Sequence, residues 1–153
     1  MEKITEKITL ETVDGQANLK DYDKAVEEMD WLEVEKHFTW SKTGKVNMVY
    51  EAIDRYVDEG KGNQTAFIYS DREREEIYTF SDLRKLSSQF ANGLLAKGIT
   101  KGDRVFIFMP RSPELYIAML GILRIGAIAG PMFEAFMEEA VHDRLSDSGA
   151  KAV

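Results

Sequence analysis

The chain has 153 residues, of which 44% are hydrophobic, enough to bury the core of about one domain. Its net charge of −7 comes from the first sixty residues, which hold 15 acids and 8 bases, and this balance argues against a nucleic-acid surface. The absence of cysteine excludes disulfides and thiolate metal sites. No signal peptide begins the chain and no apolar run reaches membrane length, so we expect a cytoplasmic protein that does not bind membranes.

The first sixty residues indicate an acidic, mainly helical leader. Its first seventeen residues show no periodicity and predict an irregular arm. Asp21 and Asp30 are predicted to cap helices over residues 21–29 and 30–37, and apolar spacing predicts a third helix over 46–58. Large apolar side chains in the leader predict that it packs against another part of the protein; they are Trp31, Leu32, Val34, Phe38 and Trp40.

A β-hairpin and a helix are predicted next. Residues 65–69 and 76–80 are rich in β-forming side chains and are separated by a charged turn. Thr79 or Ser81 should cap a helix over 81–97, and Asp82 completes a capping box with Thr79. The expected buried face of this helix consists of Leu83, Leu86, Phe90 and Leu94.

The central stretch predicts a strand, a helix and a second strand. Residues 104–109 form a short apolar run that ends at a proline, and Ser112 stands at the N-cap of an apolar helix over 115–125. Residues 127–132 return as a second strand, so the unit is a parallel crossover. The predicted fold class is α/β: a partial parallel sheet of strand–helix–strand units, an added β-hairpin and a helical N-terminal leader.

The last residues predict one more helix, over 137–148, and then the opening of another strand at 151–153. A domain seldom ends on an inner strand, so we expect residues 61–153 to be the first part of a larger domain, truncated at its C-terminal end, behind the leader of residues 1–60. Unpaired strand edges recruit other chains, and we therefore expect self-association.

Few residues present recognisable catalytic or metal chemistry. Glu139 and His142 share a helix face, as do Glu33 and His37, but acidic neighbours favour a solvated face over a metal site. Ser112 lacks the glycine elbow of a serine nucleophile. Arg111 could hold an anion at the start of the helix, although a surface arginine is the favoured interpretation. No metal site and no nucleotide-binding glycine fingerprint are predicted.

The turn Phe133-Glu134-Ala135-Phe136 is the main candidate site. It follows the second strand of the crossover unit, and open parallel sheets place ligands outside the carboxyl ends of their strands. Two aromatic rings and a carboxylate could line a ligand channel there, or the rings could simply pack against the rest of the protein. From the residues alone both interpretations are open.

The stretch GDRVFIFMPRSPELYIAMLGILRIGAIAGPMFEAF, residues 102–136, closely resembles the N-terminal part of AMP-forming acetyl-CoA synthetases, in the adenylate-forming superfamily. The shared pattern is GDRV, an apolar strand, MP-x-SPE, an apolar helix ending in RIGA and a phenylalanine-rich turn. The resemblance extends from about residue 18 to the end of the chain and includes Trp31, residues 36–40 and residues 78–80.

This resemblance implies a two-step ligase. ATP and acetate, or a short-chain carboxylate, would give an acyl-adenylate and pyrophosphate, and the thiol of CoA would then displace AMP, with Mg²⁺ assisting. The family's phosphate loop, its nucleotide-binding Thr-Glu segment and its catalytic lysine do not occur in residues 1–153. We therefore expect no catalytic residue, no bound cofactor and no activity in this piece alone. The alternative is a stand-alone α/β interaction module that kept the scaffold without catalysis.

The resemblance also bears on the turn at 133–136. Many acetyl-CoA synthetases have Phe-Gly-Gly-Phe there, beside the tunnel for the CoA pantetheine. Phe133 and Phe136 match this pattern, whereas Glu134 and Ala135 occupy the glycine positions and should narrow or recharge the passage. The acid that the parent enzyme prefers is not set by residues in this stretch.

Overall fold

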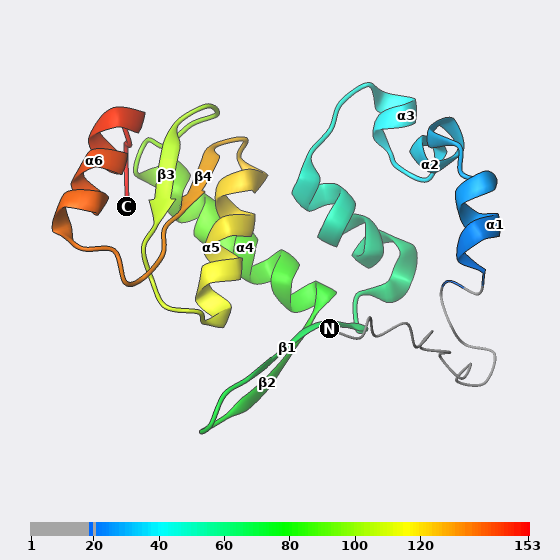
Figure 1. Cartoon of the computed structure of the whole chain (residues 1–153), viewed down its shortest axis with the longest axis horizontal. Helices are drawn as coiled ribbons and strands as arrows, with labels where there is room; N and C mark the ends of the chain where they lie inside the picture. The colour runs from blue at the N-terminus through cyan, green and yellow to red at the C-terminus, as the bar shows by residue number, and fades with distance from the viewer. Residues whose placement is uncertain (1–18, 20) are drawn as a thin grey trace, which may run out of the picture. The chain divides into compact units, whose positions relative to one another are not determined.

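The structure is a computed structural model that describes Leu19 and residues 21–153, in two compact units that divide after Phe38. The described part of the first unit has two short helices, α1 (Tyr22–Glu27) and α2 (Trp31–Lys36) (Figure 1). The predicted caps are confirmed, because the Asp21 carboxylate accepts from the N–H of Lys24 at 3.1 Å and that of Asp30 accepts from the N–H of Leu32 at 2.8 Å.

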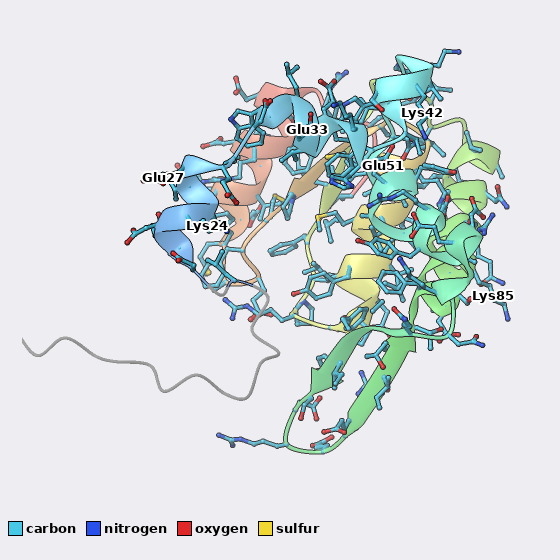
Figure 2. The ribbon with its side chains drawn as sticks, turned by 90° about the vertical axis from the view of Figure 1, so that its right-hand side faces the viewer. Lys24, Glu27, Glu33, Lys42, Glu51 and Lys85 are labelled. Carbon is cyan, nitrogen blue, oxygen red and sulfur yellow. The ribbon has the colours of Figure 1, made fainter. Side chains whose placement is uncertain are left out.

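The largest apolar side chains of these two helices remain exposed. Trp31 exposes 74% of its surface and Leu32 exposes 67%, and neither helix has a buried residue. Val34, Phe38 and Trp40 are half-buried, and farther along the predicted leader Val49 and Ile53 are buried in a core cluster with Leu83 of the helix after the hairpin. The packing of Trp31 and Leu32 stays a prediction. Figure 2 shows charged side chains such as Lys24 and Glu27 projecting from α1. The predicted irregular arm falls outside the described residues, and the predicted division at residue 60 stays a prediction.

The second unit begins with α3 (Trp40–Thr43), which ends at Gly44 in a left-handed conformation. A longer helix over residues 48–61 follows and contains two wide-turned segments, η1 (Tyr50–Asp54) and η2 (Val57–Lys61). Its last turn is broken at Gly60, which has a left-handed backbone conformation. The helix over 48–61 confirms the one expected over 46–58. Asn47 starts it: its side-chain oxygen accepts from the N–H of Val49 at 3.0 Å, while its amide donates to the carbonyl of Arg124 at 3.0 Å.

The predicted hairpin and helix are confirmed. Strands β1 (Thr65–Ser70) and β2 (Glu75–Thr79) pair antiparallel, and α4 (Phe80–Ala96) follows directly. Thr79 and Asp82 form the predicted capping box at its start.

The buried face of α4 differs from the prediction. It consists of Leu83, Ser87 and Ala91, whereas Phe90 is 38% exposed, so its expected burial was wrong. Ser87 can occupy the core because its hydroxyl donates to the carbonyl of Leu83 at 2.6 Å and accepts from Arg124 at 3.0 Å. A buried polar group with both partners in place costs little.

The crossover unit consists of β3 (Arg104–Ile107), α5 (Pro113–Arg124) and β4 (Ile128–Pro131), with the two strands parallel. Helix α6 (Glu138–Ser148) follows, and Ala152 then forms a parallel bridge with Val105 on β3. The α/β class, the parallel pair and the opening of a further strand are thus as predicted. The apolar core lies between β3, β4, α4 and α5 and contains Ile99, Val105, Ile107, Ala118, Ile122 and Ala127.

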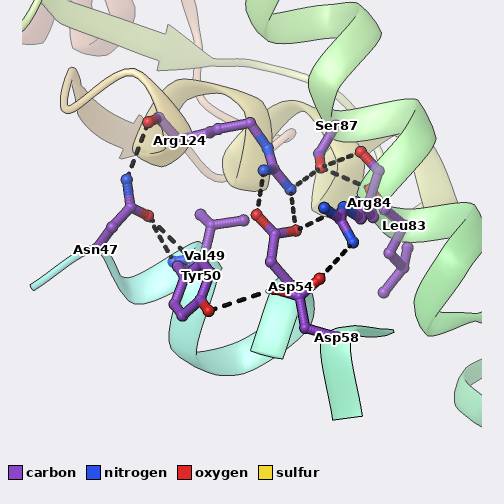
Figure 3. Close-up of polar contacts among 9 residues, drawn as sticks. All are labelled: Asn47, Val49, Tyr50, Asp54, Asp58, Leu83, Arg84, Ser87 and Arg124. Carbon is purple, nitrogen blue, oxygen red and sulfur yellow. Dashed lines mark hydrogen bonds and ion pairs between the residues drawn. The ribbon is translucent and has the colours of Figure 1, made fainter. Parts of the chain in front are cut away.

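An ion-pair network joins the helix over 48–61 to α4 and α5 (Figure 3). The Arg124 guanidinium donates to both oxygens of the Asp54 carboxylate, at 2.6 and 2.9 Å. Arg84 reaches the same carboxylate at 3.8 Å and that of Asp58 at 2.9 Å. Because Asp54 is 8% exposed, its charge is held inside the protein by these partners. The network therefore fixes how three helices meet.

The Gly-Asp-Arg stretch before β3 has a structural role. The Asp103 carboxylate accepts from the N–H of Thr100 at 2.6 Å and from Lys151 Nζ at 2.8 Å. Arg104 donates to the carbonyls of Ser148 at 2.9 Å and Gly149 at 2.7 Å. These bonds satisfy the free carbonyls at the end of α6 and connect that end to β3. The stretch thus holds the last described segment on the sheet.

Asp103 should make stability depend on acid pH. Lys151 and the N–H of Thr100 lower the pKa of Asp103 to about 2, from an ordinary value of 3.8. A lowered folded-state pKa gives stability that is present above about pH 4 and lost as the pH falls toward about 2. We expect Asp103→Asn to lower the urea midpoint at neutral pH, with a difference from the unchanged protein that vanishes near pH 2. The exposed Asp143 provides the control Asp143→Asn, and a difference that persists at pH 2 would contradict the assignment.

Candidate functional site

The candidate site lies where β3 and β4 end. The segment after β3 leads into α5, and the segment after β4 forms the turn at 133–136, so both reach the same edge of the parallel pair. Between them is a hollow of about 240 Å³. Its lining combines apolar side chains with one cation and one carboxylate: Met109, Arg111, Leu115, Pro131, Met132, Phe133 and Glu134.

The four predicted residues form one tight turn. The N–H of Phe136 donates to the carbonyl of Phe133 at 3.0 Å, and the two rings meet edge to face with their centres 5.8 Å apart. Phe133 is 58% exposed, and Glu134 and Ala135 are exposed as well. The turn therefore presents an aromatic surface and a carboxylate to the outside, which suits contact with a ligand and offers no nucleophile.

Arg144 on α6 is a member of this site that the sequence did not indicate. Its guanidinium lies over the ring of Phe136, 4.2 Å from the ring centre, and it also donates to the carbonyl of Ala140 at 2.7 Å. A cation over an aromatic face stabilises the ring in place. No local pattern connects residues 136 and 144, because they meet only once the turn and α6 have formed.

The start of α5 is arranged differently from the prediction. Ser112 stands at the N-cap position, but its side chain makes no capping bond to the helix. Its hydroxyl instead hydrogen-bonds Glu114, and this bond lowers the pKa of the Glu114 carboxyl. Arg111 is exposed and lines both the hollow by the turn and a second hollow beside β1. It is thus a surface arginine that faces two concave regions.

The other paired candidates do not form sites. His142 lies on exposed α6, where its nearest acidic oxygen is that of Asp143 at 3.6 Å, and Glu33 is paired with Lys36. Across residue 19 and residues 21–153, no three His, Asp or Glu side chains come together as metal ligands would. In the same part of the chain no helix has both the length and the apolar character needed to cross a membrane.

The sequence of this chain is similar to those of known synthetases. The family model described as AMP-binding enzyme matches residues 54–153. The acetyl-coenzyme A synthetase of Bacillus subtilis (strain 168) is 54% identical over 94% of this chain and 25% of that protein. The 3-hydroxypropionyl-coenzyme A synthetase of Sulfurisphaera tokodaii is 38% identical over 74% of this chain and 18% of that protein.

A solved structure of another acyl-CoA synthetase has a similar fold. A crystal structure of an acyl-CoA synthetase from Brucella canis superposes with a TM-score of 0.75 at 37% identity, covering 87% of this chain and 24% of that one. The chain thus spans about a quarter or less of the length of the proteins it matches. The matched region includes the hairpin, the crossover unit and the turn at 133–136, and on this evidence the chain belongs to the AMP-binding enzyme family.

Proposed function

We propose that this chain is the N-terminal portion of an ATP-dependent ligase that joins acetate, or another short-chain acid, to CoA through an acyl-adenylate. The observation that supports it most is the 54% identity to the Bacillus subtilis acetyl-coenzyme A synthetase across nearly the whole chain. The piece would supply scaffold and one wall of a ligand passage, in the cytoplasm, and would not catalyse the reaction alone.

ATP, Mg²⁺ and CoA are the expected cofactors of the complete enzyme. Mg²⁺ would neutralise phosphate charge when bound. The described residues bring together no group of acidic side chains that fits the metal, so none of them is assigned to holding it or to the adenylation step. What this chain contributes is the crossover unit, whose strand ends carry the turn at 133–136.

A chimera tests the proposal. The segment of the Bacillus subtilis synthetase that matches this chain is replaced by residues 1–153, and acetate-dependent ATP–pyrophosphate exchange and acetyl-CoA formation are measured. We expect the chimera to be active and the 153-residue chain alone to be inactive in both assays. A folded chimera without activity would contradict the proposal and favour the stand-alone interaction module. ATP–pyrophosphate exchange by the 153-residue chain alone would contradict its expected inactivity.

We also propose that the turn at 133–136 borders the passage for CoA. Support comes from its place at the carboxyl end of β4, from the exposed ring of Phe133 and from the hollow of about 240 Å³ beside it. Glu134 is an exposed residue in the lining of this hollow, and CoA is an anion. A carboxylate at that place should repel it.

Removing this carboxylate should therefore strengthen CoA binding. In the chimera, Glu134→Gly is expected to lower KM for CoA about fivefold, since a screened charge at this range contributes about 1 kcal/mol, and to leave KM for ATP and acetate unchanged. The control Glu138→Gln removes an exposed carboxylate from the first turn of α6. If all three KM values moved together, or none moved, the turn would have no specific relation to CoA.

A further inference from the structure

Among the described strands, β1 has one edge without a partner, and it carries no charged residue. The hairpin is a two-stranded sheet of β1 and β2, and no other described strand pairs with it. Figure 1 shows it extending past the N-terminal start of α5. The six residues of β1, Thr65–Ser70, include no Asp, Glu, Lys, Arg or Pro. Proteins usually protect an edge with charge or proline, and β1 has neither over its length.

The opposite edge is protected. Strand β2 carries Glu75 and Glu76, and Glu76 is paired with Arg74 at 2.8 Å. The two edges are otherwise alike, because Ile68 on β1 and Ile77 on β2 lie directly opposite each other and are each 59% exposed. Strand β2 carries two glutamates and β1 carries no charge, so β1 is the edge suited to receive another strand.

The backbone of β1 offers free hydrogen-bonding groups at known positions. The N–H of Asp71 donates to the carbonyl of Arg74 at 3.0 Å, which makes this the closing hydrogen-bonded pair of the hairpin. Hydrogen-bonded and non-hydrogen-bonded pairs alternate along antiparallel strands. Tyr69 therefore bonds toward β2, and the N–H and carbonyl groups of Ile68 and Ser70 point outward.

Space for a strand lies beside this edge. A hollow of about 380 Å³ is lined by Phe67, Ile68, Tyr69, Ser70, Arg111 and Tyr116. The ring centres of Phe67 and Tyr116, which both belong to this lining, lie 5.6 Å apart, and this contact connects the hairpin to α5. Arg111 adds a positive charge next to the uncharged strand, so an incoming strand should bring a carboxylate to this place.

We propose that β1 pairs antiparallel with β1 of a second copy of this chain, with Ile68 opposite Ser70 of the second copy. This register uses all the outward-pointing groups of Ile68 and Ser70 on both copies, as a two-fold interface requires. It sets Tyr69 against Tyr69 of the second copy, and Asp71 of the second copy opposite Phe67. Within its own hairpin the Asp71 carboxylate accepts from the hydroxyl of Tyr69 at 2.7 Å and from two backbone N–H groups of the turn. In this register it also approaches Arg111, which lines the hollow beside β1. The inference concerns the hairpin and α5 only and does not depend on the ligase activity.

Two matched proline variants test which edge pairs. Ile68→Pro and Ile77→Pro each remove one outward N–H and one exposed isoleucine, from opposite edges of the same hairpin, where proline is tolerated. In sedimentation equilibrium of the 153-residue chain we expect a dimer for the unchanged protein and for Ile77→Pro, and a monomer for Ile68→Pro. A monomeric unchanged protein, or equal effects of the two variants, would overturn the proposal.

Two further variants test the register and guard against misfolding of the hairpin. Since the chain has no cysteine, Tyr69→Cys should form a disulfide dimer on mild oxidation, whereas Glu76→Cys, its partner across the hairpin, should not. Arg111→Glu lies outside the hairpin and should weaken the dimer about tenfold. Equal crosslinking at both positions, or a dimer unaffected by Arg111→Glu, would show that the pairing is not the one proposed.

Discussion

Replacing Arg124 with methionine is expected to lower the free energy of unfolding by about 3 kcal/mol, the usual loss when one partner of a buried ion pair is removed. Methionine fills a similar volume, so the loss reports the charge and not a cavity. Among the described residues, Arg84 at 3.8 Å would then be the one cation left within ion-pair distance of Asp54. The Asp54 side chain is only 11% exposed and faces Arg84 and Arg124 from two neighbouring helices (Figure 3), so little water can replace the lost partner. Urea unfolding followed by circular dichroism measures the change.

Two control variants show whether the loss arises from the buried ion pair. Arg84→Met removes a guanidinium that is 43% exposed, and exposed pairs contribute less than about 1 kcal/mol, so it should have a small effect. The double variant Asp54→Leu with Arg124→Met leaves no unpaired charge and should be more stable than Arg124→Met alone. If Arg84→Met were as damaging as Arg124→Met, the stabilisation would not arise from the buried pair.

The second large effect concerns Gly121, where α5 crosses α4. A Cβ atom there would lie 2.7 Å from a ring carbon of Phe90 and 3.0 Å from the carbonyl oxygen of Ser87. The carbonyl belongs to the helix backbone and cannot move aside by a rotamer change. Gly121→Ala should therefore destabilise by about 2 kcal/mol, the usual range for an overpacked core, despite the better helix propensity of alanine.

Gly93 on α4 provides the matched control. Apart from the backbone of its own helix, no atom of the described residues lies within 4 Å of a Cβ built at Gly93, so Gly93→Ala should raise stability by about 0.5–1 kcal/mol through helix propensity alone. The same chemical change is thus expected to have opposite signs on the two helices. Thermal unfolding of both variants measures the two changes in stability. If both changes had the same sign, α4 and α5 would not approach each other this closely.

Local signals predicted most of the elements. Asp21, Asp30 and Thr79 accept hydrogen bonds from N–H groups two or three residues ahead, so the sequence contains all that these caps need. The parallel pair of β3 and β4 was predictable because a short apolar strand, a proline-started helix and a second apolar strand admit few other arrangements.

The features that were missed depend on distant residues. Arg124 meets Asp54 and Ser87, which lie 70 and 37 residues away, and nothing near Arg124 indicates either partner. The position of Phe90 was misjudged for the same reason, since apolar periodicity assigns large residues to the core, whereas close helix packing favours Ser87. Periodicity reports one helix at a time, but burial depends on the neighbour.

At the candidate site, the sequence predicted the turn at 133–136 and its place after β4. It could not predict that Arg144 lies over Phe136, because that contact requires α6 to be folded back against the turn. Which ligand the turn contacts stays a prediction that the CoA measurements address.

The bridge between Val105 and Ala152 has a consequence for synthesis on the ribosome. The buried residues of the cluster around β3 and α5 are all present in the sequence by Ala127, but one side of β3 gains its partner only at Ala152. At ordinary translation speeds, the intervening residues take on the order of a few seconds to appear. During that interval a nascent chain with a formed core should display an unsatisfied β3 flank, which is a substrate for chaperones that recognise extended segments.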